Sequence, residues 1–240
     1  NNIELMATPF DLASLELMDK LGFESIKIGS GDITNIPLLK KIKETQKNVI
    51  ISTGMANLGE IEEALSVFNN SLADISLLHC TSNYPAQPEQ VNLRAIKTLK
   101  SAFKKRVGFS DHTVGIDIPA AAVALGAEII EKHLTLDCSL PGPDHRASLE
   151  PSLFSLMVDS IRRVEKALGD GVKQCQDCEI DVRNIARKSI TARRDINKGE
   201  FLTEDNLAVK RPGTGLHPRY YEYFIGKKAA VEIKEDQQLN

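Results

Sequence analysis

The 240-residue sequence has no tryptophan, and aromatic residues make up only 5% of it. It has no apolar run near the roughly 20 residues that a membrane-spanning helix needs. The first ten residues, NNIELMATPF, lack the basic flank and apolar core of a secretory signal. A net charge of -3 gives no broad basic surface of the kind that binds nucleic acid or anionic membranes. We therefore expect a cytoplasmic protein with no nucleic-acid and no membrane partner.

The sequence has only four cysteines, and they lack the pattern of a structural zinc site. Cys80 ends an apolar run, Cys138 lies in a loop, and Cys175 and Cys178 form an isolated CQDC. A structural zinc ion needs four ligands, usually from two such pairs, and neither a second pair nor a nearby histidine pair is present. Free thiols are the favoured interpretation, and a zinc knuckle is the alternative.

Apolar runs of strand length alternate with helical patterns through most of the chain. The helical patterns include DLASLELMDKLG, GEIEEALSVFN and GIDIPAAAVALGA, in which apolar residues recur at helical spacing. This alternation predicts an α/β fold with parallel strands and helices outside them. The six expected strands are residues 3–8, 25–30, 48–53, 75–80, 106–111 and 128–133.

Two architectures compete for this pattern, a doubly wound open sheet and a (β/α)8 TIM barrel. A doubly wound sheet predicts a glycine-rich phosphate loop, but GSGDIT and STGMANLGE match neither the GxGxxG nor the Walker pattern. Each expected strand ends on polar residues, as in barrel enzymes, whose sites lie at that rim. We therefore predict a TIM barrel. Because six βα units are two short of closure, we expect its first two strands to precede this sequence; a six-stranded sheet is the alternative.

The pattern changes near Glu150. Residues 150–171 predict the last long helix, with Pro151 at its start and Gly169 and Gly171 at its end. Beyond a polar connector, short alternating runs broken by NKGE and RPGTG predict a small module of strands and turns. We expect the barrel in residues 1–172, a linker in residues 173–187 and the small module in residues 188–240.

Two histidines stand at the ends of adjacent expected strands, His112 in GFSDHT and His133 in EIIEKH. Parallel strand ends meet at one edge of a sheet, so the two imidazoles, with carboxylates nearby, could bind a divalent metal. Alternatively, each histidine hydrogen-bonds a neighbour in the core. For Glu131, the alternative to a site role is an ion pair with Lys132 or another barrel residue.

Lys27 lies on an apolar strand, where an unpaired ammonium is costly, and a phosphate or carboxylate partner would explain it. The stretch PGPDHRAS fits a surface loop, from which Asp144 and His145 could still reach a site at the strand ends.

Eight motifs follow one another through nearly the whole chain: ATPFD, KIGSGDITNIPLL, ISTGM, LLHCTSNYPA, GFSDHT, EKHLTLD, PGPDH and RPGTGL. Together they resemble the sialic acid synthase family, the N-acetylneuraminate-type synthases. The resemblance implies a TIM barrel followed by an antifreeze-like SAF domain. It also implies a C–C bond-forming condensation of phosphoenolpyruvate with an N-acetylmannosamine-type sugar, and a divalent metal, typically Mn²⁺.

The resemblance further implies roles for individual residues. His112 and His133 match the metal ligands, and with Glu131 and Lys27 they form the catalytic set. The positions that hold phosphoenolpyruvate are matched by Thr8, Lys27, Ser30, Ser52 and Ser110. The sugar side is matched by Tyr84, Asn83, Asp144 and Arg211. Ser82 stands where some members have asparagine, which leaves the acetamido contact of this loop open.

The family's dimers place the SAF domain of one chain over the barrel of the other, so Arg211 is expected to act on a neighbouring subunit. Family residues on the first two strands have no counterpart here, and the tail is expected to stop short of the family's C-terminus. We accordingly expect residues 1–240 alone to be inactive.

Two other functions remain open. One is another phosphoenolpyruvate-dependent sugar-acid synthase or a barrel aldolase, and the other is a non-catalytic sugar-binding protein. The acceptor is also open between N-acetylmannosamine, its 6-phosphate and a 2,4-diacetamido-6-deoxy sugar.

Overall fold

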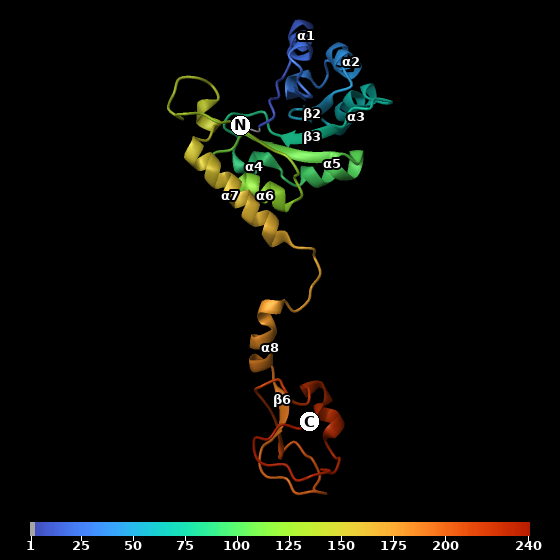
Figure 1. Cartoon of the computed structure of the whole chain (residues 1–240), viewed down its shortest axis with the longest axis vertical. Coiled ribbons are helices and arrows are strands. Elements are labelled where there is room, and N and C mark those ends of the chain that lie inside the picture. Colours follow the sequence, from blue (N-terminus) through green and yellow to red (C-terminus); the bar gives the residue numbers. More distant parts are fainter. Residues whose placement is uncertain (1–2) are drawn as a thin grey trace. The chain divides into compact units, whose positions relative to one another are not determined.

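The structure, a computed structural model, describes residues 3–240 and divides into two compact units. The first extends to Asp170, and the second is Gly171–Asn240 (Figure 1). Within residues 3–240, no helix is both long and apolar enough to cross a membrane.

The first unit is built on a curled, all-parallel sheet of five strands. The strands are β1 (Ser25–Ile28), β2 (Asn48–Ser52), β3 (Ile75–Cys80), β4 (Arg106–Asp111) and β5 (Ile130–Lys132). Their spatial order, β1-β2-β3-β4-β5, is the same as their chain order. A doubly wound sheet reverses its order at a switch point, whereas sequential order is typical of a barrel wall. The sheet is therefore a half-barrel.

The prediction of a first strand over residues 3–8 is wrong, because these residues form no strand. Only one bridge forms there, between Ala7 and Ile26, where the Lys27 amide donates to the Ala7 carbonyl. The Ile3 and Leu5 side chains are exposed, so this segment lacks the buried face that fixes the register of a strand. Five parallel strands and one bridge replace the six strands predicted.

Helices precede, connect and follow the strands of the first unit. They are α1 (Leu12–Lys20), α2 (Ile36–Glu44), α3 (Leu58–Val67), α4 (Pro88–Val91), α5 (Ala95–Phe103), α6 (Asp117–Ala124) and α7 (Pro151–Leu168), with the short 3₁₀ helices η1 (Ser30–Asp32) and η2 (His145–Ala147). Local sequence sets their starts. Asp11 caps α1, and Asn57 with Glu60 forms a capping box at α3. The last helix begins at Pro151 and ends before Gly169, as predicted.

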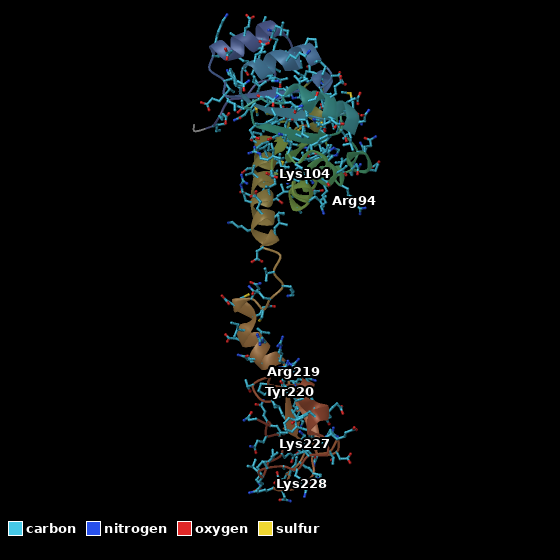
Figure 2. The ribbon with its side chains drawn as sticks, turned by 90° about the vertical axis from the view of Figure 1, so that its right-hand side faces the viewer. Arg94, Lys104, Arg219, Tyr220, Lys227 and Lys228 are labelled. Atoms are coloured by element: carbon cyan, nitrogen blue, oxygen red, sulfur yellow. The ribbon has the colours of Figure 1, made fainter. Side chains whose placement is uncertain are left out.

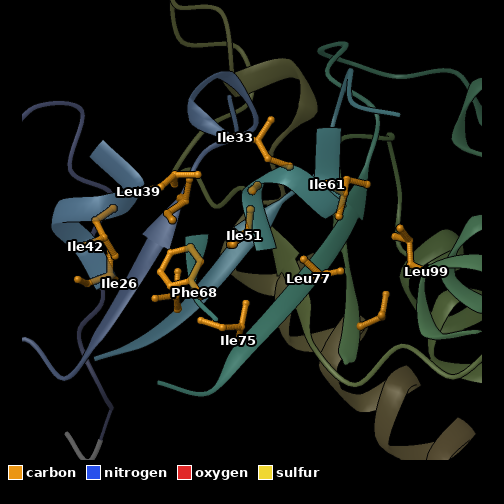
Figure 3. Packing of buried hydrophobic residues seen from close by; sticks show 14 of the residues in the cluster. Ile26, Ile33, Leu39, Ile42, Ile51, Ile61, Phe68, Ile75, Leu77 and Leu99 are labelled. Atoms are coloured by element: carbon orange, nitrogen blue, oxygen red, sulfur yellow. The ribbon is translucent and has the colours of Figure 1, made fainter. Parts of the chain in front are cut away.

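The core lies between the helices and one face of the sheet (Figure 3). Because side chains alternate along a strand, every second strand residue faces the helices. The strand residues on that face are Ile26, Ile28, Val49, Ile51, Ile75, Leu77, Val107 and Phe109. The intervening residues, among them Lys27, Ser52 and Ser110, therefore face the concave side.

The second unit has a small core of its own, formed by Ile190, Ala192, Ile196, Leu202, Leu207, Ala229, Ile233 and Leu239. Its elements are η3 (Asp177–Glu179), α8 (Ile180–Ala186), β6 (Ser189–Ala192), β7 (Leu207–Lys210), η4 (Pro218–Tyr220) and α9 (Tyr221–Phe224). The strands β6 and β7 pair antiparallel. The second unit is thus built from short strands, short helices and turns.

Basic side chains of the second unit lie against its aromatic rings. Figure 2 labels Arg219, Tyr220 and Lys227 there, and the Arg219 guanidinium carbon lies 4.9 Å from the Tyr220 ring centroid. The Lys227 Nζ lies 3.0 Å from the Tyr223 ring centroid, and this neighbour lowers the pKa of the Tyr223 hydroxyl. These cations therefore pack on surface aromatics.

Candidate active site

The carboxyl ends of β4 and β5 bring together the polar residues that the sequence singled out. Ser110 and His112 come from the end of β4, and Glu131 and His133 from β5 and the residue after it. Within each pair the residues are two apart, so both point to the concave face. Gly108 permits the close approach of these strands, because a Cβ there would lie 2.4 Å from the Ile129 carbonyl oxygen.

The two histidine rings lie edge to face, with their centroids 5.4 Å apart and their planes at 76°. His112 is buried, and its Nδ1 donates to the Thr81 carbonyl at 2.7 Å. This bond fixes the tautomer and leaves Nε2 with a free lone pair, 3.4 Å from the Ser110 Oγ. Burial lowers the pKa of His112, with the Thr81 hydrogen bond opposing it, so the ring is neutral at pH 7.

Tyr84 and Asp144 complete this end of the site. The Tyr84 ring centroid lies 4.1 Å from that of His112 and 5.7 Å from that of His133. Burial raises the pKa of the Tyr84 hydroxyl, and the Cys80, Asp144 and Glu131 groups add to the rise. The Asp144 carboxylate lies 3.8 Å from the His133 Nδ1. The PGPDH loop thus reaches the strand ends through Asp144.

These residues fit a divalent metal as an open site. Two imidazoles are suitable ligands, and His112 already has its second nitrogen bound to a carbonyl, as metal-binding histidines usually do. Among the described residues, no group of three or more His, Cys, Asp or Glu side chains is arranged to hold a metal. A metal held by the histidine pair would therefore take its remaining ligands from water or substrate.

Lys27 provides a buried cation at the neighbouring part of the same edge. Its Nζ donates to the Ser52 Oγ at 2.6 Å and to the Ile28 carbonyl at 3.1 Å. The Glu131 Oε2 lies 3.5 Å away. The other oxygen of Glu131 accepts a 2.5 Å hydrogen bond from Ser110. Glu131 thus connects the cation to the histidine pair.

The Ser30 hydroxyl follows β1 and contacts the turn after β2. Ser30 Oγ accepts a hydrogen bond from the Gly54 amide at 3.0 Å and lies 3.2 Å from the Cys80 Sγ. A Cβ on Gly54 would lie 2.8 Å from the Ser30 Oγ, so this turn requires glycine. Thr8 lies beside Gly29, since its methyl group is 4.0 Å from the position of a Cβ on Gly29.

Two residues on the predicted sugar side are engaged elsewhere. The Asn83 amide donates to the Gln90 side chain at 3.1 Å. Arg211 belongs to the second unit, where its Nε donates to the Ala186 carbonyl at 3.1 Å. The structure thus leaves both sugar-binding assignments as predictions.

Two sequence-based alternatives are also resolved. Glu131 forms an ion pair with another barrel residue, Lys27, as the alternative to a site role predicts, and not with Lys132, which pairs with Asp111. His145 is engaged by Thr135, whose hydroxyl lies 2.7 Å from the His145 Nδ1. The Asp111–Lys132 ion pair was not predicted from the sequence, although the alternation of side chains places both residues on the face of the sheet away from the histidines. The Thr81 carbonyl was missed because a backbone atom leaves no sequence signal.

Comparison with known proteins assigns both parts of the chain. Residues 1–173 match the NeuB family, and residues 187–240 match the SAF domain. The chain is 53% identical to the N,N'-diacetyllegionaminic acid synthase of Campylobacter jejuni, over 99% of this chain and 72% of that protein. It is 38% identical to the pseudaminic acid synthase of the same strain, over 95% of this chain and 66% of the relative.

A solved structure agrees with this similarity. The N-acetylneuraminic acid (sialic acid) synthetase of Leptospira borgpetersenii, in complex with citrate, is 45% identical, with a TM-score of 0.71. The matched region covers 76% of this chain and 65% of that one. The chain thus spans about two thirds to three quarters of the length of these proteins.

Proposed function

The chain belongs to the NeuB family and carries a SAF domain, and from this membership we propose that it condenses phosphoenolpyruvate with an N-acetylmannosamine-type sugar. The products are a nonulosonic acid and inorganic phosphate. The observation that carries the proposal is the junction at Glu131, which joins the buried Lys27 to the paired histidines at one sheet edge.

Lys27 and the neighbouring hydroxyls form the end that binds phosphoenolpyruvate. The ammonium is buried and has three donors, of which two bond to Ser52 and the Ile28 carbonyl. The remaining donor and the positive charge suit a phosphate or carboxylate oxygen. The hydroxyls proposed to share this anion are those of Thr8, Ser30, Ser52 and Ser110.

The histidine end binds the open-chain sugar. His112 and His133 would hold a divalent metal, for which we propose Mn²⁺, and the bound metal would supply Lewis acidity toward the aldehyde oxygen. Tyr84 contacts both rings, tilted against His112 and edge-on to His133, and its hydroxyl is proposed to bind the sugar. Asp144 is placed to accept hydrogen bonds from sugar hydroxyls. Asn83 and Arg211 are proposed as further sugar contacts.

The reaction forms one C–C bond and breaks one C–O bond. C3 of phosphoenolpyruvate attacks the aldehyde carbon, and the aldehyde oxygen takes a proton. Water adds at the cationic C2 and gives up one proton, which balances the proton taken by the aldehyde oxygen. The phosphate then leaves with the bridging oxygen, and the new C2 hydroxyl loses its proton to the phosphate as the ketone forms. Glu131 lies between Lys27 and Ser110, and we assign it as the base that accepts the proton from this water. Holding both substrates in line contributes much of the acceleration.

The identity pattern favours a legionaminic-type acceptor, a 2,4-diacetamido-6-deoxy sugar. Two synthases from one Campylobacter jejuni strain differ in their similarity to this chain, at 53% for the diacetyllegionaminic enzyme and 38% for the pseudaminic enzyme. N-acetylmannosamine and its 6-phosphate are the alternative acceptors.

The proposed assembly is a barrel enzyme with a C-terminal SAF domain. Sequential strand order supports a half-barrel that belongs to a (β/α)8 barrel, with residues 1–172 as its part, 173–187 as linker and 188–240 as SAF domain. We propose a homodimer in which the SAF domain of one chain covers the barrel of the other. We also propose the cytoplasm as its location. A crystal structure of the natural full-length protein tests the barrel and the dimer.

Phosphate release tests the function. The natural full-length protein, with Mn²⁺ and phosphoenolpyruvate, is given each of the three acceptor sugars in turn. We expect phosphate release only when a sugar is present, with the diacetamido sugar giving the highest kcat/KM. Phosphate release without sugar, or no release with any sugar, contradicts the proposal.

A further inference from the structure

A buried ion pair lies directly behind the histidine pair. The Lys132 Nζ donates to the Asp111 Oδ2 at 2.7 Å, and neither side chain has any exposed surface. Asp111 precedes His112, and Lys132 lies between Glu131 and His133. Because side chains alternate along a strand, the pair faces the helices while its neighbours face the concave side. It therefore cannot touch a substrate there.

Thr113 extends the pair into a closed network. The Asp111 Oδ1 accepts hydrogen bonds from the Thr113 amide at 3.0 Å and from its hydroxyl at 2.8 Å. The Lys132 Nζ also donates to the Thr113 carbonyl. Asp111 and Thr113, the residues before and after His112, are thus both bound by the Lys132 side chain of β5. Lys132 in turn directly precedes His133.

Stability alone does not account for charges at this position. Burying two ions costs desolvation energy, and well-packed apolar residues of similar volume often stabilise a protein equally well. Unlike an apolar contact, a hydrogen-bonded ion pair fixes the orientation of its two side chains and the distance between them. Asp111 and Lys132 are also direct partners in the β4–β5 register, so their bond locks the relative position of the two strand ends.

We propose that Asp111 and Lys132 are positioning residues that set the spacing and orientation of His112 and His133 for the metal. This inference rests on the metal role proposed above. It adds a function for two residues that do not touch substrate or metal.

The main test removes both charges together, because removing one would leave the other buried and unpaired. In the double variant Asp111→Asn with Lys132→Met, the amide oxygen can still accept from Thr113, and methionine fills the lysine volume. We expect the Kd for Mn²⁺ without substrates, measured from the free Mn²⁺ signal by electron paramagnetic resonance, to rise at least 10-fold. We expect kcat to fall at least 10-fold, KM for phosphoenolpyruvate to change less than threefold, and Tm to shift by only a few degrees.

A matched control uses another ion pair near β5. Lys100 of α5 lies 2.5 Å from Glu128, which precedes β5, but both side chains are partly exposed. The double variant Lys100→Met with Glu128→Gln should leave the Mn²⁺ affinity and kcat unchanged. Equal losses in the two double variants would overturn the positioning role, since any pair near β5 would then have the same effect.

A milder variant decides the matter if the main one does not fold. Thr113→Val removes one hydrogen bond to Asp111 and keeps both charges, and we expect a two- to fivefold weaker Mn²⁺ affinity. Unchanged Mn²⁺ affinity in the folded double variant, or in Thr113→Val if the double variant does not fold, would overturn the inference alone. Absence of Mn²⁺ binding in the unchanged protein would instead refute the metal assignment, and the inference with it.

Discussion

Replacing Lys27 with methionine tests the phosphoenolpyruvate end of the site. The change removes the buried charge and keeps most of the side-chain volume. Two of the three Nζ donors bond to Ser52 and the Ile28 carbonyl, and the Glu131 oxygen at 3.5 Å is too distant for a strong hydrogen bond. One donor is therefore available to the substrate. A hydrogen bond to a charged group contributes about 1.5–3 kcal/mol, which corresponds to a loss of about 10- to 150-fold in kcat/KM.

The assay is steady-state phosphate release with each substrate varied in turn. We expect kcat/KM for phosphoenolpyruvate to fall within that range, while KM for the sugar changes less than threefold. The exposed Lys97 of α5 gives a matched control, because Lys97→Met removes the same charge from the helix surface. Thermal unfolding checks that the Lys27→Met variant is folded. A loss below threefold, or an equal loss for both substrates, would refute the role assigned to Lys27.

Three further predictions follow from the same site. The double variant His112→Ala with His133→Ala should lose Mn²⁺ binding and turnover, which chelation should also abolish; full activity would refute the metal assignment. Arg211→Ala should lose sugar affinity and turnover while Mn²⁺ binding persists, and mixing it with His112→Ala should restore part of the activity; no recovery after verified subunit exchange would argue against a site shared between subunits. Burial lowers the pKa of His79 and His112, so protons bind the unfolded chain more readily. The free energy of unfolding should then be highest above about pH 6.5, the ordinary histidine pKa. It should fall as the pH drops toward the lowered pKa values of the folded protein. Urea unfolding midpoints measure this, and His79→Gln should make the decline shallower; a stability independent of pH between 5 and 7 would refute it.

The sequence predicts most of the sheet because its strands are buried and β-branched. The strands β3 and β4 occupy the expected residues 75–80 and 106–111. The strand predicted over residues 3–8 does not form, because an apolar segment needs a neighbouring strand that pairs along its whole length. Half-barrel order is a spatial property that the alternation of elements could only suggest.

The two-residue alternation of side chains along a strand decides which polar residues belong to the candidate site. Lys27, Ser52, Ser110 and Glu131 share the concave face because each strand presents alternate residues to it. His79 ends β3 just as plausibly in the sequence, yet it faces the helices, where its Nε2 bonds the Val91 carbonyl at 2.6 Å. Counting from the buried apolar residues of each strand would have excluded it. The orientation of Asn83 depends on a loop contact with Gln90 that no periodicity predicts.

Phosphoenolpyruvate labelled with ¹⁸O at the bridging oxygen gives the most direct test of the proposed condensation. The natural full-length protein is incubated with Mn²⁺, the labelled phosphoenolpyruvate and the acceptor sugar. Mass spectrometry then measures the ¹⁸O content of the phosphate and of the sugar acid. We predict one unlabelled nine-carbon acid for each phosphate released, with all of the label in the phosphate. Label retained in the sugar acid, or labelled phosphate with no new C–C bond, would contradict it.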